Sequence, residues 1–200
     1  MKRIGIFGMS GNPPHCSHLA IANECIRRNL VDKVWVLPTY NHTQKQNSAS
    51  FEQRVKMCQM MFGNGLFSKI KVKRYEEMNK SGYMFDMIAI LKSMFEKHEF
   101  YIIIGRDCAD SISSWFNYEA LRSTVPFIVF ERFGMKEDFG LETWYFFKPH
   151  QMVTALGCDV SSTRVRSLVK CKEFSIIGNL TNKKIAEYIK KENLYEDITN

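Results

Sequence analysis

The sequence has no apolar run long enough for a membrane-spanning helix. Its most apolar runs, 101–104 and 125–130, have the length of strands in a core, whereas a transmembrane helix needs roughly 20 such residues. The opening Met1-Lys2-Arg3 is followed by an apolar stretch that is too short for a secretory signal peptide. We therefore expect a soluble, cytoplasmic protein with no membrane partner.

Paired cysteines are missing as well. The chain has six cysteines, and no two of them have the C-x-x-C spacing that is typical of zinc ribbons and thioredoxin-like redox pairs. In a chain without a secretory signal, we expect buried, reduced thiols that pack as small apolar groups.

The composition excludes several further classes of protein. Hydrophobic residues make up 45% and charged residues 24% of the 200 residues, which is typical of a globular domain and not of a disordered chain, a collagen-like repeat or a coiled coil. The chain has no internal repeat and no linker rich in Pro or Gly. We expect a single domain over residues 1–200, with a helical C-terminal part from about residue 160.

Basic residues outnumber acidic ones. The chain has 28 lysines and arginines against 21 aspartates and glutamates, a net charge of +7. Such an excess either serves solubility or binds anionic partners such as nucleotides or nucleic acid. The composition does not decide between these explanations, but the positions of the cations can.

Short apolar runs and helical patterns alternate along most of the chain. Strands are expected at 2–7, 34–37, 70–73, 101–104, 127–130 and 145–147. Helices are expected at 15–30, from Ser50 with its capping partner Gln53 to about 61, and up to 95 with Ser81 as a candidate cap. Further helical segments are expected to end at 122, to begin at 161, and to span 183–191. The alternation predicts an α/β fold with a Rossmann-like, doubly wound, mostly parallel sheet and a helical C-terminal extension. In such a sheet, ligands bind beyond the carboxyl ends of the strands at the topological switch point.

The first strand opens into a loop, 8–14, that leads to two histidines at a helix start. The loop matches neither G-x-G-x-x-G nor the P-loop pattern, so neither a Rossmann dehydrogenase nor a P-loop ATPase is supported. His15 and His18 are three residues apart and share one face of the helix. Three explanations stay open: helix-capping histidines, a two-histidine metal site without an evident third ligand, and donors to a phosphate at the helix N-terminus.

A second polar cluster opens the helix that begins at 161. Ser162 and Thr163 are ordinary residues for a helix start. Their hydroxyls, the free N–H groups of the first turn, and Arg166 on the same face also make a clamp for an extended phosphate chain. The segment alone fits both explanations.

Together, these segments resemble a known family. Residues 8–18 (G-M-S-G-N-P-P-H-C-S-H) resemble the G-G-[S/T]-F-D-P-x-H-x-G-H signature of the nucleotidyltransferase superfamily, and residues 160–166 resemble its I-S-S-T-x-I-R partner. Residues 103–107 and 114–119 are similar to the Gly-x-Asp and aromatic segments of nicotinate (nicotinamide) mononucleotide adenylyltransferases of the bacterial type. Residues 127–134 fit the strand that follows there. The resemblance covers nearly the whole chain.

The resemblance implies a transfer of AMP from ATP to nicotinate mononucleotide, and also to nicotinamide mononucleotide, in NAD biosynthesis. The products are a dinucleotide and pyrophosphate, and the mononucleotide phosphate attacks the α-phosphorus in line. Because that phosphate is already ionised, catalysis relies on positioning and electrostatic stabilisation and not on a strong base. Mg²⁺ is the implied cofactor, held by phosphate oxygens and water.

The resemblance also implies roles for single residues. His15 and His18 are the implied catalytic donors to the triphosphate. The implied ATP-binding residues are Gly8, Ser10, Lys45, Gly105, Asp107, Ser162, Thr163 and Arg166. The implied mononucleotide-binding residues are Tyr83, Trp115 and Arg132.

Several of these residues also fit other roles. Trp115 is equally a candidate core or interface aromatic, Tyr83 a plain helix-start residue, and Lys45 a solvated lysine. Arg132 is a candidate either for stacking on adenine or for clamping the acceptor phosphate. Five positions depart from the family pattern without removing a phosphate-binding group: Met9, Gly11, Asn12, Ser17 and Met84.

Three other functions are kept as alternatives. Phosphopantetheine adenylyltransferases and cytidylyltransferases belong to the same superfamily, and a non-catalytic module would bind nucleotides or RNA without turnover. A phosphopantetheine enzyme would leave the 103–107 segment and Trp115 unexplained. We expect ATP and a pyridine mononucleotide as partners in preference to nucleic acid, and the sequence is compatible with a homo-oligomer.

Overall fold

The protein is described from a computed structural model, which covers residues 1–41, 49–63, 69–131, 144–154 and 160–196. Its strands are β1 (Lys2–Met9), β2 (Lys33–Pro38), β3 (Ile70–Val72), β4 (His98–Gly105), β5 (Phe127–Phe130) and β6 (Gln151–Val153). Its α-helices are α1 (Cys16–Arg27), α2 (Phe51–Phe62), α3 (Met84–Met94), α4 (Arg106–Asp110), α5 (Tyr118–Thr124), α6 (Ser162–Lys170), α7 (Phe174–Leu180) and α8 (Lys183–Lys191). Three 3₁₀ helices are η1 (Tyr75–Met78), η2 (Ile112–Ser114) and η3 (Trp144–Phe146).

The six strands form one parallel sheet in the order β3-β2-β1-β4-β5-β6. The chain moves from β1 outward to β3, then returns to the other side of β1 and moves outward again from β4 to β6. This order confirms the predicted Rossmann-like, doubly wound fold. The switch point lies between β1 and β4, so the loops after these two strands flank the expected ligand crevice.

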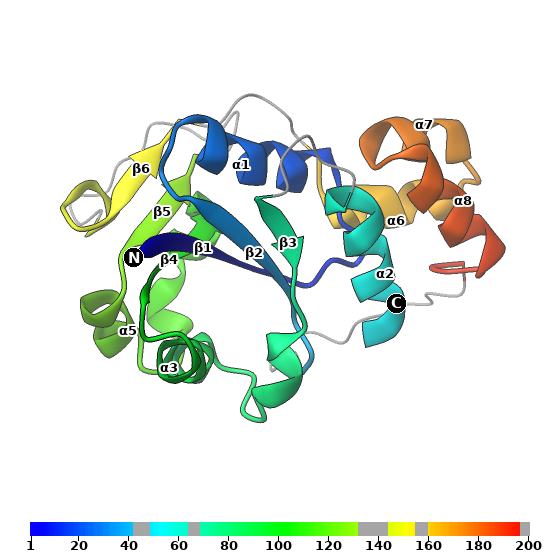
Figure 1. The fold of residues 1–200 in the computed structure, drawn as a ribbon. Coiled ribbons are helices and arrows are strands. Elements are labelled where there is room, and N and C mark those ends of the chain that lie inside the picture. Colours follow the sequence, from blue (N-terminus) through cyan, green and yellow to red (C-terminus); the bar gives the residue numbers. More distant parts are fainter. Residues whose placement is uncertain (42–48, 64–68, 132–143, 155–159, 197–200) are drawn as a thin grey trace.

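Both faces of the sheet are covered (Figure 1). Side chains alternate along each strand, so Ile4 and Ile6 of β1 face one apolar layer while Phe7 and Met9 face the other. Helices α1 and α2 pack on the second layer together with α6–α8, and α3, α4 and α5 pack on the first. Burial on both faces explains why the strands are almost uniformly apolar.

The C-terminal helices lie beside α2, as the orange and red ribbons show (Figure 1). Asn182 caps α8 by accepting a hydrogen bond from the Ile185 N–H (2.9 Å), and its amide donates to the Met60 carbonyl at the end of α2 (3.1 Å). Ile185 and Ile189 are fully buried. The predicted helical C-terminal extension is confirmed, and it packs directly on the sheet layer that contains α2.

Several local predictions hold, and others need correction. Ser50 and Gln53 form the predicted capping box, with N···O distances of 2.9 and 3.3 Å. Ser81 does not cap α3. Tyr83 is the N-cap, and the Ser81 hydroxyl accepts from the Tyr83 N–H (3.2 Å) while donating to Asp86 (2.6 Å). Helix α7 was not predicted.

The strand predicted at 145–147 is wrong. That stretch is the 3₁₀ helix η3, and the edge strand β6 lies a few residues later. The Tyr145 ring is buried, and its hydroxyl donates to Asp110 at 2.8 Å. An aromatic run looks like a strand in the sequence, but here it is packed against α4 by tertiary contacts.

The described cysteines differ in burial, and Cys16 is partly buried. Cys25 and Cys58 are buried, and burial raises the pKa of each thiol to about 12. The expectation of buried thiols is wrong for Cys108 and Cys171, which are exposed. Cys158 lies outside the described residues.

Among the helices of the described ranges, none is long and apolar enough to cross a membrane.

Candidate active site

The loop after β1 is shaped by its contact with α2. Gly11 has a φ of +64°, and a Cβ placed on it would lie 2.7 Å from the Cys58 Sγ. A side chain here would meet both the left-handed backbone and a buried thiol. The family pattern has an aromatic at this position, and the close approach of α2 explains why this chain has glycine.

The two histidines lie at the start of α1, with their ring centroids 3.7 Å apart. His15 is the N-cap residue and is buried. The Nδ1 of His18 accepts a hydrogen bond from the His15 backbone N–H at 3.2 Å. In a neutral His18 ring, this bond assigns the proton to Nε2, which is then a donor.

Burial lowers the pKa of His18 well below its ordinary value, and the neighbouring His15 lowers it further. His18 is therefore neutral at physiological pH. One ring nitrogen of His18 caps the helix, and donation from the other ring nitrogen to a phosphate stays a prediction. Within the described ranges, no group of three His, Cys, Asp or Glu side chains is arranged to hold a metal ion.

The start of α6 contacts the first loop directly. The Ser162 hydroxyl donates to the Pro13 carbonyl (2.8 Å), although the two residues are 149 positions apart. Arg166 donates through Nη1 to the Asn12 carbonyl (2.8 Å) and through Nη2 to the Thr163 hydroxyl (3.2 Å). The two segments that the sequence predicts to bind phosphate thus lie together, at the carboxyl end of the central strand.

Sequence reasoning missed Arg54, which lies on α2 beneath the same loop. Its side chain is 2% exposed. It donates through Nη1 to the Ser10 carbonyl (2.7 Å) and through Nε to the Ala49 carbonyl (3.2 Å). A signal was present, because Arg54 lies in the otherwise apolar stripe of α2, next to Val55 and Cys58.

The second loop of the crevice follows β4, the neighbour of β1. Gly105 is the N-cap of α4, and Asp107 lies in the first turn of that helix. A Cβ on Gly105 would lie 2.7 Å from an Asp107 carboxylate oxygen. The glycine therefore makes room for the carboxylate to fold back over the strand end. Both residues lie at the crevice edge, as the sequence predicted, and their contacts with ATP stay a prediction.

The predicted mononucleotide residues lie near the start of α3 and the end of η2. The methyl carbon of Met84 lies 2.7 Å from the position of a Cβ on Gly8, which places the start of α3 against the end of β1. Tyr83 is 38% exposed and stacks on Phe116, with ring centroids 4.6 Å apart and planes 24° apart. Trp115 is partly buried against the layer that contains α3. Phe116 was not among the residues predicted to bind the mononucleotide.

Two predicted residues lie outside the described residues. Lys45 belongs to the stretch 42–48, and Arg132 to the stretch 132–143. Their roles stay predictions from the sequence.

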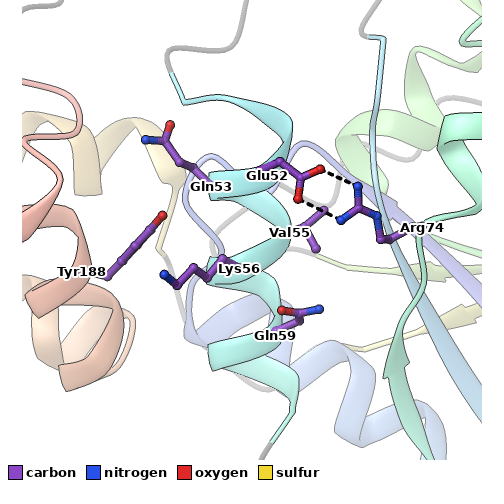
Figure 2. A pocket seen from close by; sticks show the side chains of 7 residues that line it. All are labelled: Glu52, Gln53, Val55, Lys56, Gln59, Arg74 and Tyr188. Atoms are coloured by element: carbon purple, nitrogen blue, oxygen red, sulfur yellow. Dashed lines mark hydrogen bonds and ion pairs between the residues drawn. The ribbon is translucent and has the colours of Figure 1, made fainter.

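A separate pocket lies between α2 and α8 (Figure 2). Arg74 forms an ion pair there with Glu52 and a second one with Glu77 (2.6 Å). The Lys56 Nζ lies 4.6 Å from the centroid of the Tyr188 ring. None of the residues that line this pocket was predicted to bind substrate, and its cations are already paired with a carboxylate or an aromatic ring.

A buried carboxyl lies beside the residues that follow β2. Glu76 of η1 is 4% exposed and accepts hydrogen bonds from the Tyr40 backbone N–H and the Asn79 side chain. Desolvation nevertheless raises its pKa from 4.5 to about 7. At neutral pH this carboxyl is only partly ionised.

The pKa of Glu76 predicts a pH-dependent stability. The folded state binds the proton of the Glu76 carboxyl more tightly than the unfolded state does. The wild-type free energy of unfolding should therefore fall by up to about 3 kcal/mol as pH rises from about 4.5 to 7. Glu76→Gln removes this dependence, so the variant should become more stable relative to wild type as pH increases. Urea unfolding of both proteins at pH 5 and pH 8 measures the effect. If the free energies of unfolding of wild type and variant differ by the same amount at the two pH values, the prediction is contradicted.

The fold and the site define a class of protein. A parallel sheet in this order, with a histidine pair after β1 and a Ser-Ser-Thr helix start bonded to the same loop, is the arrangement of a nucleotidyltransferase. Residues 6–168 match the family model described as cytidylyltransferase-like. The chain belongs to this family.

Full-length relatives narrow the class. The chain is 31% identical to the nicotinate-nucleotide adenylyltransferase of Bacillus subtilis over 199 residues, which cover 98% of this chain and 100% of the relative. Within the cytidylyltransferase-like proteins, the chain thus belongs to the nicotinate-nucleotide adenylyltransferases. The nicotinic acid mononucleotide adenylyltransferase of Plasmodium falciparum in complex with NaAD has a similar fold, with a TM-score of 0.87, 23% identity and 98% coverage of both chains. A complex of that enzyme with APC gives a TM-score of 0.83.

Proposed function

We propose that this protein transfers AMP from ATP to nicotinate mononucleotide, and also to nicotinamide mononucleotide, in NAD biosynthesis. The observation that carries the proposal is the contact between α6 and the first loop, in which Ser162 and Arg166 bond to the Pro13 and Asn12 carbonyls. This contact gathers hydroxyls, a guanidinium and two histidines around one strand end. An extended, highly charged phosphate chain is the ligand that such a donor set fits best.

Two helix N-termini add to this site. Helix α1 begins directly after His15, and helix α6 begins after its N-cap Ser161. The first N–H groups of a helix have no partner within the helix, and the helix dipole favours negative charge at this end. Both helices begin at the same loop, so their dipoles stabilise an anion at a common position.

In the proposed reaction, a phosphate oxygen of the mononucleotide forms a bond to the α-phosphorus of ATP. The bond between the α-phosphorus and the bridging oxygen breaks, and pyrophosphate leaves with the electron pair. The attacking oxygen is already ionised, so no general base is required. The Nε2–H of neutral His18, with Arg166, stabilises the charge that develops on the triphosphate.

The donor set around the loop bears on the implied Mg²⁺. It consists of imidazole, hydroxyl and guanidinium groups, whereas Mg²⁺ prefers carboxylate oxygens, phosphate oxygens and water. These residues do not fit a resident metal ion. We therefore treat Mg²⁺ as part of the substrate MgATP, where it neutralises phosphate charge, while the protein's own groups hold the phosphate oxygens.

Trp115 is the proposed stacking partner of the pyridine ring. Trp115→Ala should raise the KM of the mononucleotide about tenfold or more, because stacking of one base on an aromatic ring contributes about 1–3 kcal/mol. The KM of ATP should change little. Phe147→Ala, at an aromatic that is 70% exposed, is the matched control. Equal increases in both KM values for Trp115→Ala would exclude the stacking role.

The experiment that tests the proposed function is an acceptor panel. Purified protein is incubated with MgATP and, in separate reactions, nicotinate mononucleotide, nicotinamide mononucleotide, phosphopantetheine or no acceptor, and pyrophosphate release is measured. A parallel series replaces ATP by CTP. The proposal predicts release with ATP and a pyridine mononucleotide. Release only with phosphopantetheine or only with CTP would support a rival superfamily activity, and no release in any reaction would support a binding module.

A further inference from the structure

Two arginines hold the same short stretch of the first loop from different helices. Arg54 of α2 donates to the Ser10 carbonyl at 2.7 Å, and Arg166 of α6 donates to the Asn12 carbonyl at 2.8 Å. Gly11, with its left-handed backbone, lies between these two carbonyls. The loop is therefore fixed on both sides by charge-assisted hydrogen bonds, which are the stronger class.

Neither guanidinium is neutralised by a carboxylate within the described part of the chain. The salt bridges within the described residues involve other arginines, such as Arg74, which pairs with Glu52 and Glu77. Arg54 is also 2% exposed, and its second bond is to a neutral carbonyl, that of Ala49. A buried cation without a counter-ion is costly, and an anion bound nearby would offset part of that cost.

The titratable groups that face Arg54 do not compensate its charge. Cys58 lies one helical turn further along α2, and burial raises the pKa of its thiol to about 12. Tyr195, in the segment after α8, is also buried, and its pKa is raised by desolvation. Both groups are neutral at physiological pH, so the region beneath the loop has a net positive charge.

We propose that Arg54 is a positioning residue of the triphosphate site, which fixes the loop for ATP and adds an uncompensated positive charge beneath it. The inference rests on the proposed function, because the anion that it serves is the triphosphate of ATP. Two of the loop's carbonyl dipoles point at guanidinium groups and are thus kept from repelling the phosphates. Arg54 also joins the Ser10 carbonyl to Ala49, so it ties the first loop to the start of α2.

The test compares ATP with adenosine as ligands in the absence of any acceptor. Calorimetry gives the Kd of each ligand for wild type, Arg54→Met and Arg54→Lys. Arg74→Met is the matched control, because Arg74 is an ion-paired arginine that lies next to α2 outside the crevice. Thermal unfolding of every variant shows whether it is folded at the temperature of the titration.

Arg54→Met should raise the Kd of ATP about tenfold or more, because the loop loses the charge-assisted hydrogen bond that fixes it and the triphosphate loses a nearby positive charge. Its affinity for adenosine should stay within about twofold of wild type. Arg54→Lys keeps the charge, so its Kd for ATP should rise less than that of Arg54→Met. It serves as the test if the methionine variant is unfolded. An unchanged Kd for ATP, or equal losses for ATP and adenosine, would overturn the proposal. If wild type binds ATP but transfers AMP to no acceptor, the proposed function fails while the Arg54 comparison still gives a result.

Discussion

Replacement of His18 by alanine is expected to lower kcat for AMP transfer by about 10²–10³-fold, which is the usual cost of losing one donor to a developing oxyanion. His18 accepts the His15 N–H through Nδ1, so its Nε2 is the nitrogen that can donate to the triphosphate. The variant should stay folded, because the lost cap involves a single hydrogen bond. Initial rates of pyrophosphate release at saturating substrates measure the effect.

His18→Asn separates catalysis from helix capping. An asparagine at this position can accept the His15 N–H in place of Nδ1, but it has no group at the position of Nε2. We therefore expect His18→Asn to be as inactive as His18→Ala and more stable. Recovery of activity in the asparagine variant would show that His18 acts only as a cap. His98→Ala is the control, because His98 opens β4 at the opposite end of the sheet.

Arg166→Met should have the second largest effect, a loss of about 10²-fold in kcat/KM for ATP. The substitution removes a charge-assisted hydrogen bond to the Asn12 carbonyl and a cation from the phosphate site. Arg164→Met is the matched control, because Arg164 is exposed on the same helix two residues earlier. Rates measured over a series of ATP concentrations give kcat/KM, and equal losses in the two variants would mean that general surface charge is responsible.

The fold could be predicted from the sequence where elements are stabilised locally. The Ser50–Gln53 capping box and the amphipathic helix at 183–191 were identified from short-range patterns. The doubly wound, mostly parallel sheet was predicted from the alternation of strands with helices, whereas the order of its strands is known only from the structure. The aromatic stretch at 145–147 was misassigned because its conformation depends on the burial of Tyr145 and its bond to Asp110, and neither contact is visible in a local pattern.

The candidate site could be predicted only in part. The two phosphate segments were identified by composition and by resemblance, and the structure brings them within hydrogen-bond distance. Arg54 was missed because its function depends on a contact with Ser10, 44 positions away. Phe116 was missed because its stacking on Tyr83 joins two separate segments.

The departures from the family pattern have structural reasons at three positions. Gly11 is needed because a larger residue would meet the Cys58 thiol. Met9 is the last residue of β1 and is buried in the layer that contains α1 and α2. Met84 packs over Gly8, so it fills space at the strand end that a smaller residue would leave open. None of these changes removes a donor from the loop.

The central claim is that AMP passes directly from ATP to the mononucleotide while the histidines act only as donors. The stereochemical course at phosphorus tests it most directly. The protein is supplied with one diastereomer of adenosine 5′-O-(1-thiotriphosphate) and nicotinate mononucleotide, and the configuration of the thiophosphate in the dinucleotide is determined. A single in-line displacement predicts inversion. Retention, with exchange of labelled pyrophosphate into ATP in the absence of the acceptor, would show an adenylylated enzyme intermediate and contradict the account.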